Sequence, residues 1–198
     1  MSQSQGAPAQ PPATTQLSRV RYRVGQFFHG FFAAELGEDE RQLVADLLPV
    51  DAAALFFEMP MDAQRHSINV LHVLGEAGYE DADLGAAALL HDVGKAEAKR
   101  AGVGINLWWR GPLVLSEAVA PERLQRQART DHSAGWRYAL HVHFAHPQIG
   151  ADWAREAGCS ELTCWLIEHH QDESAPDEET IDHRYQLLAA LQWADGLN

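Results

Sequence analysis

The chain is poor in cysteine. Its 198 residues include only 2 cysteines, which excludes a disulfide framework. Cys159 and Cys164 lie five positions apart, so on a helix their side chains would point about 140° away from each other. We therefore expect two buried thiols in a reducing compartment.

Basic residues are also scarce. The chain has 15 lysines and arginines against 28 aspartates and glutamates, a formal net charge of -13. Duplex nucleic acid is bound through its phosphates, which require a basic face. The composition thus argues against a dedicated binder of duplex nucleic acid, and any phosphate chemistry must rely on local cations.

Long apolar runs and targeting signals are missing. Asp46, Pro49 and Asp51 interrupt the most hydrophobic region, from Leu43 to Met61, before it reaches the roughly 18 residues of a membrane span. Residues 1–16 hold no charged side chain and no apolar run, so they lack the parts of a secretory signal. We predict a cytoplasmic protein in which membrane contact is not expected.

Apolar residues are present in the number that a folded domain needs. They make up 46% of the chain, and they recur at helical spacing, with no long alternation of period two. The sequence therefore predicts an all-α fold with a disordered tail (1–16), an N-terminal helical extension (17–59) and one main domain (60–198). Helices of that domain are expected at 62–77, from 81 or 83 to about 94, at 147–157, 160–170 and 182–196.

The segment from Leu17 to Leu36 has phenylalanines at helical spacing, preceded by three arginines. We interpret it as an amphipathic helix packed on the domain, with its arginines in solvent. A helix lying on a membrane surface, or docked on a partner, is the alternative.

Histidines and aspartates gather at the ends of apolar helices. His91 and Asp92 close the helix AALLHD, and Asp195 ends an apolar stripe in LLAALQWAD. His66 comes within reach of them if its helix and the next form an antiparallel hairpin. Two imidazoles and two carboxylates suit a divalent transition metal or magnesium.

A second group of histidines lies between the halves of the first. His146 precedes Pro147, which suggests a helix N-cap with proline at the first position. His169 and His170 end an apolar helix. These three imidazoles suggest a second ion bridged to the first by Asp92, the arrangement of two-metal phosphoester hydrolysis.

The ordered pattern H, HD and a distant D, together with HDVGK, HPQIG, the HH pair and ADGLN, resembles the HD-domain metal-dependent phosphohydrolases over about residues 60–198. That resemblance implies an all-helical HD-domain bundle with two metal ions, as in the HD-GYP phosphodiesterases and the HD-type diadenosine tetraphosphate hydrolases. It implies that one ion is held by His66, His91, Asp92 and Asp195, and the other by Asp92, His146, His169 and His170. Asp92 and Lys95 would be the catalytic residues, with Lys95 facing the substrate phosphate; a solvated lysine is the alternative.

Substrate contacts are expected from a basic segment and one histidine. HD-GYP proteins follow their HH pair with a glutamate and a GYP-containing loop, whereas this chain has Gln171, so cyclic dinucleotide specificity is not expected. The residues predicted to contact substrate are Arg110, Arg123, Arg126 and His143. The alternatives are solvated arginines and, for His143, a place on the surface or behind the metal ligands.

The sequence thus predicts a metal-dependent phosphohydrolase. It would cleave a phosphomonoester or phosphodiester bond of a nucleotide or related small phosphate, using a metal-activated water and two divalent ions from the set Fe, Mn, Ni, Co, Zn and Mg. The alternative is a non-catalytic regulatory module that binds a nucleotide. The residues select neither one metal of this set nor an oligomeric state.

Overall fold

The computed structural model describes residues 35–103, 125–172 and 182–197. All regular elements in these ranges are helices, and no strand occurs among them, which confirms the predicted all-α class. The predicted tail (1–16) and nearly all of the predicted helix at 17–36 lie outside the described residues. None of the described helices is long and apolar enough to cross a membrane.

Two short helices precede the main bundle. They are α2 (Glu38–Leu47) and α3 (Val50–Glu58), separated by Pro49, which caps α3. Val44 of α2 and Phe56 of α3 are fully buried in the same core cluster as the later helices. The domain boundary before residue 60 stays a prediction.

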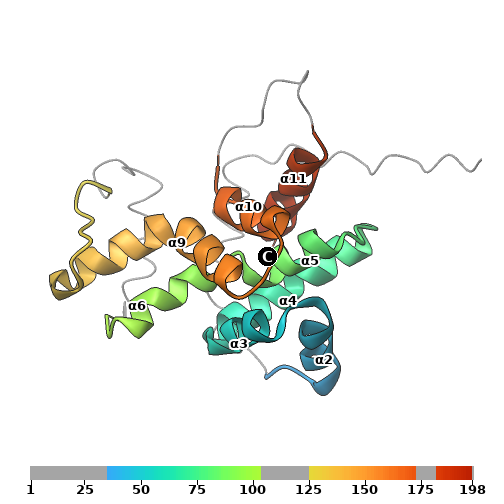
Figure 1. Ribbon diagram of the computed structural model, residues 1–198, viewed down its shortest axis with the longest axis horizontal. Coiled ribbons are helices and arrows are strands. Elements are labelled where there is room, and N and C mark those ends of the chain that lie inside the picture. Colours follow the sequence, from blue (N-terminus) through green and yellow to red (C-terminus); the bar gives the residue numbers. More distant parts are fainter. Residues whose placement is uncertain (1–34, 104–124, 173–181, 198) are drawn as a thin grey trace, which may run out of the picture.

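The next two helices form the predicted hairpin, α4 (Met61–Glu76) and α5 (Ala82–Leu90), which lie side by side in Figure 1. Gly78 makes the turn between them at φ 85°, a backbone conformation that favours glycine. The Asp81 carboxylate then accepts a hydrogen bond from the Leu84 N–H and so caps α5. The hairpin places the start of α4 beside the end of α5.

The helix of the HD motif ends earlier than predicted, at Leu90 instead of about Gly94. Asp92 leaves helical geometry, at φ −100° and ψ 1°, and a 3-10 turn, η2 (Val93–Ala96), leads into the short α6 (Glu97–Arg100). A Cβ atom added to Gly94 would lie 2.2 Å from the His146 carbonyl oxygen. Only glycine lets η2 approach the following helix this closely.

That helix is α9 (Trp136–Glu156), 21 residues long, which follows the 3-10 turn η3 (His132–Ala134) and extends outward from the bundle in Figure 1. The prediction that a helix begins at Pro147, with His146 as its N-cap, is wrong. Pro147 lies inside α9. It has no N–H to donate to the His143 carbonyl, and that carbonyl accepts a hydrogen bond from the His146 ring instead.

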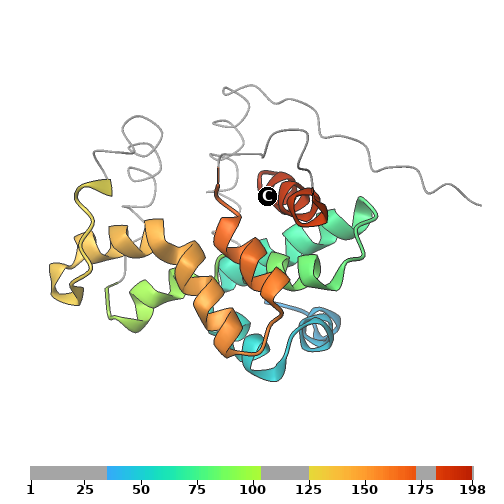
Figure 2. The same cartoon turned by 45° about the horizontal axis from the view of Figure 1, so that its top comes forward.

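Two helices complete the bundle, α10 (Glu161–His169) and α11 (His183–Asp195), as Figure 2 shows from a second side. The Ser160 hydroxyl caps α10 by accepting from the Thr163 N–H. α10 packs on α9 and α5, and α11 packs on α4. Of the two cysteines, Cys164 is buried as predicted and Cys159 is half-buried.

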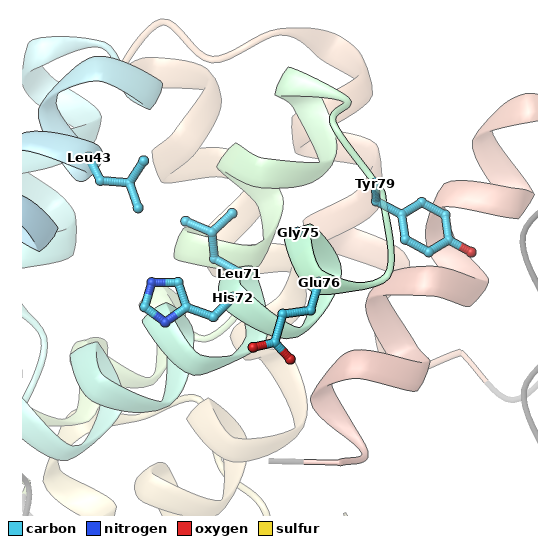
Figure 3. A pocket seen from close by; sticks show the side chains of 6 residues that line it. All are labelled: Leu43, Leu71, His72, Gly75, Glu76 and Tyr79. Atoms are coloured by element: carbon cyan, nitrogen blue, oxygen red, sulfur yellow. The ribbon is translucent and has the colours of Figure 1, made fainter.

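Figure 3 shows a shallow groove of about 340 Å³ between α2, α4 and the turn after α4. Its lining is mostly apolar and consists of Leu43, Leu71, His72, Gly75, Glu76 and Tyr79. These residues belong to none of the groups of predicted metal ligands.

Candidate metal centre

Separate helices bring six predicted ligands together. His66 comes from α4, and His91 and Asp92 follow α5, while Asp195 is the last residue of α11. His146 comes from the middle of α9, and His170 follows α10. Two three-residue groups able to hold a metal result, His66–His91–Asp92 and Asp92–His146–His170.

In the first group the potential donor atoms lie close together. His66 Nε2 is 3.3 Å from His91 Nε2 and 2.9 Å from Asp195 Oδ1. His91 Nε2 is 3.6 Å from the same Asp195 oxygen. Since ligands at about 2.1 Å from a metal are roughly 3.0–3.4 Å apart in octahedral or tetrahedral geometry, these spacings fit one divalent ion.

In the second group, two imidazole nitrogens face one carboxylate oxygen. Asp92 Oδ1 is 3.4 Å from His146 Nε2 and 3.9 Å from His170 Nε2. Both Nε2 atoms are buried without a hydrogen-bond partner. Buried polar atoms nearly always have a partner, so this pair fits a site built for a metal ion.

Asp92 belongs to both groups, and its second oxygen, Oδ2, lies 3.8 Å from His91 Nε2. Burial favours the neutral acid, but the charges of Lys95 and His91 outweigh it and hold the pKa of Asp92 well below its usual range. At neutral pH this side chain is therefore a carboxylate shared by the two groups.

Asp195 is likewise held ionised. Burial would raise its pKa, but hydrogen bonds from His66 and His91 outweigh that effect and keep the pKa of this carboxyl well below its usual range. Each of the two ligand groups thus has a negative charge to offer a cation.

The buried imidazole of His91 differs in charge from those of His146 and His170. Burial disfavours a charge on His91, but the neighbouring Asp92 and Asp195 carboxylates raise its pKa to about 9. Burial lowers the pKa of His146. Burial, with the nearby charge of His91, lowers the pKa of His170 to about 3. His146 and His170 are therefore neutral, the form that binds metals.

Backbone carbonyls orient the buried imidazoles. His91 Nδ1 donates to the Ala88 carbonyl at 2.9 Å, and His170 Nδ1 donates to the Ile167 carbonyl at 2.7 Å. His146 Nδ1 donates to the His143 carbonyl at 2.6 Å. With the proton on Nδ1, the Nε2 lone pairs of His146 and His170 are directed to the centre, as in protein metal sites, whereas a metal bound to His91 would first have to displace the second proton of that ring.

His169, a predicted ligand, is not brought to either group. Its ring stacks on Trp165 at a centroid distance of 4.4 Å, and its Nδ1 donates to the Trp165 carbonyl at 2.8 Å. Adjacent residues near a helix end differ by about 100° in direction, so one member of the HH pair turns inward and the other outward. The structure selects His170.

Lys95 does reach the centre. Its Nζ atom is 2.7 Å from the Asp92 carboxylate, while its side chain stays 44% exposed. Its ammonium group thus lies between Asp92 and solvent, a position from which it can meet an anion.

The residues predicted to bind substrate have mixed outcomes. His143 lies one turn from His146, with their ring centroids 6.2 Å apart. Arg126 is exposed in the segment before η3. Arg110 and Arg123 lie outside the described residues.

Sequence reasoning missed two residues that shape this centre. Gly94 lets η2 pack on the backbone of α9 beside His146, and Pro147 was read as the start of a helix. The available signals were the glycine two residues after HD and the proline directly after a histidine in an apolar helix.

Comparisons with known proteins add no relative. No family model matches the chain, and no curated protein or solved structure does either. What the centre does must therefore be argued from its own residues.

Proposed function

We propose that this protein is a metal-dependent phosphohydrolase with two divalent ions per chain, acting on a phosphomonoester or phosphodiester of a nucleotide or related small phosphate. The observation that carries the proposal is the pair of unpartnered, buried Nε2 atoms of His146 and His170 facing Asp92, next to the first ligand group. Two ions sharing one carboxylate are typical of metal-assisted phosphoryl chemistry.

The resemblance to the HD-domain phosphohydrolases supports this reaction class. The residues that carry the resemblance, His66, the HD pair and Asp195, are those whose side chains meet in the first group. The chain thus has both the order of these residues along the sequence and a spacing suited to a metal.

The donor set limits the choice of ion. It consists of imidazole nitrogens and carboxylate oxygens, which suit iron, manganese, cobalt, nickel and zinc. A cytoplasmic location, as the composition predicts, is consistent with any of these metals.

When bound, the ions would act as Lewis acids on the phosphoryl oxygens and on the attacking water. The protein's part is to hold the ligands and leave one side open. His146 is fully buried, whereas the side chains of His66 and Asp195 are 24% and 34% exposed. A phosphate would therefore arrive on the side of His66, Asp195 and Lys95.

Lys95 is placed to bind that phosphate. Its ammonium group can exchange its contact with Asp92 for a phosphoryl oxygen once the carboxylate binds cations. It would then stabilise negative charge that develops during attack on phosphorus.

The HH pair provides a matched test. We expect His170→Gln to lose one metal ion per chain and to lower phosphoester turnover by about 100-fold or more, whereas His169→Gln keeps both properties within about twofold. The measurement combines elemental analysis with a panel of nucleotides and nitrophenyl phosphoesters.

Equal losses in the two variants would contradict the assignment of His170. If the metal-loaded wild-type chain cleaves none of these phosphoesters but binds a nucleotide tightly, the hydrolase proposal fails in favour of the regulatory module.

A further inference from the structure

The three buried imidazoles make the same kind of hydrogen bond to the backbone. Each donates its Nδ1 proton to the carbonyl three residues earlier, at Ala88, His143 and Ile167. Inside an α-helix that carbonyl normally accepts the N–H of the residue directly after the histidine. Where that N–H is absent, the ring is the donor that replaces it.

Helix ends free the carbonyl in two of the three cases. α5 ends at Leu90 and α10 ends at His169, so Ala88 and Ile167 are among the last four residues of their helices. Carbonyls at these positions have no partner within the helix and take one from elsewhere. His91 and His170, each just beyond its helix, supply that partner.

His146 has no helix end beside it. α9 continues to Glu156, ten residues further along the chain. The donor to the His143 carbonyl would be the N–H of residue 147, and this residue is proline, which has none. The proline therefore removes, in the middle of a helix, the N–H donor that a helix end removes for the other two histidines, and the His146 ring takes its place on the His143 carbonyl.

His169, the last residue of α10, makes a different backbone contact. It bonds the carbonyl four residues back, at Trp165, and its ring lies along the helix against Trp165 instead of facing Asp92. The two kinds of carbonyl contact thus separate the three inward rings from the outward one.

We propose that Pro147 is a positioning residue for the second metal ion. By removing one helical N–H, it leaves the His143 carbonyl to bind Nδ1 of His146, which fixes the tautomer whose Nε2 faces Asp92. The role of Pro147 toward a metal rests on the proposed two-metal function, but its effect on the tautomer is a property of the chain itself.

The surroundings leave His146 few other partners. Both His146 and Pro147 are buried, and Gly94 packs against the α9 backbone at the His146 carbonyl and the Gly150 nitrogen. With residue 147 donating an N–H, the ring and the backbone would compete for one carbonyl at close range.

The test compares Pro147→Ala with the wild-type chain, and uses Pro49→Ala, at the exposed cap of α3, as the control proline variant. Nitrogen-15 spectra of the metal-free chain report the tautomer of His146, and calorimetric titration with Zn²⁺ or Mn²⁺ reports each binding step. We expect wild-type His146 to carry its proton on Nδ1 and Pro147→Ala to show a mixture of tautomers.

In Pro147→Ala we also expect the ion at Asp92, His146 and His170 to lose about 10-fold or more in affinity, the loss typical of altered outer-shell partners. The ion held by His66, His91 and Asp195 should bind as in the wild type. Thermal stability should not fall, because alanine suits a helix interior better than proline. If Pro147 only supported the fold, Pro147→Ala would instead lower the thermal stability and leave the ratio of the two metal affinities unchanged.

Several results would overturn the inference. They are a wild-type His146 with its proton on Nε2, a Pro147→Ala chain with wild-type affinity for both ions, or an equal loss at both ions. The wild-type spectrum tests the predicted tautomer of His146 even if Pro147→Ala does not fold. Failure of the wild-type chain to bind two ions would refute the proposed function, while the tautomer would still test Pro147.

Discussion

At the scale of single residues, Asp92 and Gly94 act together in the HDVG turn. Asp92 offers one oxygen toward His91 and the other toward His146 and His170. Gly94 sets the distance between this turn and α9, because the His146 carbonyl fills the space that a side chain would need. The bridging position of Asp92 depends on that close approach.

Replacing Gly94 tests this dependence. We expect Gly94→Ala to destabilise the fold by about 1–3 kcal/mol, since an added methyl group would force η2 away from the α9 backbone. The same shift should weaken metal binding to the second group. Urea unfolding and metal titration measure the two effects.

Gly75→Ala is the matched control. Gly75 lies in the last turn of α4, and a Cβ atom there would meet nothing within 4 Å. It should be neutral or stabilising by roughly 0.5–1 kcal/mol. If Gly94→Ala were equally harmless, the close packing of η2 on α9 would be refuted.

At the residue scale, part of the metal centre could be predicted from the sequence and part could not. The ligand types and their order along the chain could be predicted, because imidazoles and carboxylates at the ends of apolar helices are costly to bury without partners. The choice of His170 over His169 could not, since the two adjacent imidazoles end the same apolar helix and the sequence does not show which of them faces Asp92.

At the scale of elements, short-range signals predicted most helices of the bundle. Gly78 and Asp81 set the turn between α4 and α5, and Ser160 sets the start of α10. α9 was misread because proline is favoured at the first position of a helix, and the sequence does not show that the freed carbonyl finds the His146 ring. Knowledge of that contact requires the fold.

One ion pair links α2 to α4 and gives a pH-dependent prediction. The Arg65 guanidinium donates to the Glu40 carboxylate; this hydrogen bond, opposed by partial burial, lowers the pKa of Glu40 from 4.5. Because the folded pKa lies below the unfolded one, the ion pair stabilises the fold above about pH 4.5 and ceases to do so as the pH falls through the lowered pKa.

We therefore expect Glu40→Gln to lower the free energy of unfolding by about 0.5–1 kcal/mol at pH 7, the usual value of a partly exposed pair. The difference from wild type should shrink toward zero as the pH falls well below 4.5. Glu38→Gln, in the same first turn, is the control for loss of charge alone. A difference that grows in acid would contradict this account.

At the scale of the whole molecule, the centre joins helices that are far apart in the sequence. His66 and Asp195 are separated by 129 positions and lie in hydrogen-bond contact. Ions bound to α4, α9 and the ends of α5, α10 and α11 would therefore link most of the bundle, and binding to the folded state alone stabilises it by mass action.

Metal removal should accordingly lower the melting temperature. A ligand present at 100 times its Kd contributes about 2.7 kcal/mol, so we expect stripping with a chelator to lower Tm by several degrees and readdition to restore it. Calorimetry measures the shift, with His66→Gln as the variant in which the response should be smaller. An unchanged Tm in the wild type would argue against ions that bridge these helices.

Metal binding by both ligand groups can be measured in one experiment, elemental analysis of the full chain, purified without added metal and without a metal-binding tag. We predict close to two divalent ions per chain, and close to none in Asp92→Ala, the variant that lacks the shared carboxylate. One ion per chain would contradict the second group, and none, even after reconstitution, would contradict the metal centre itself.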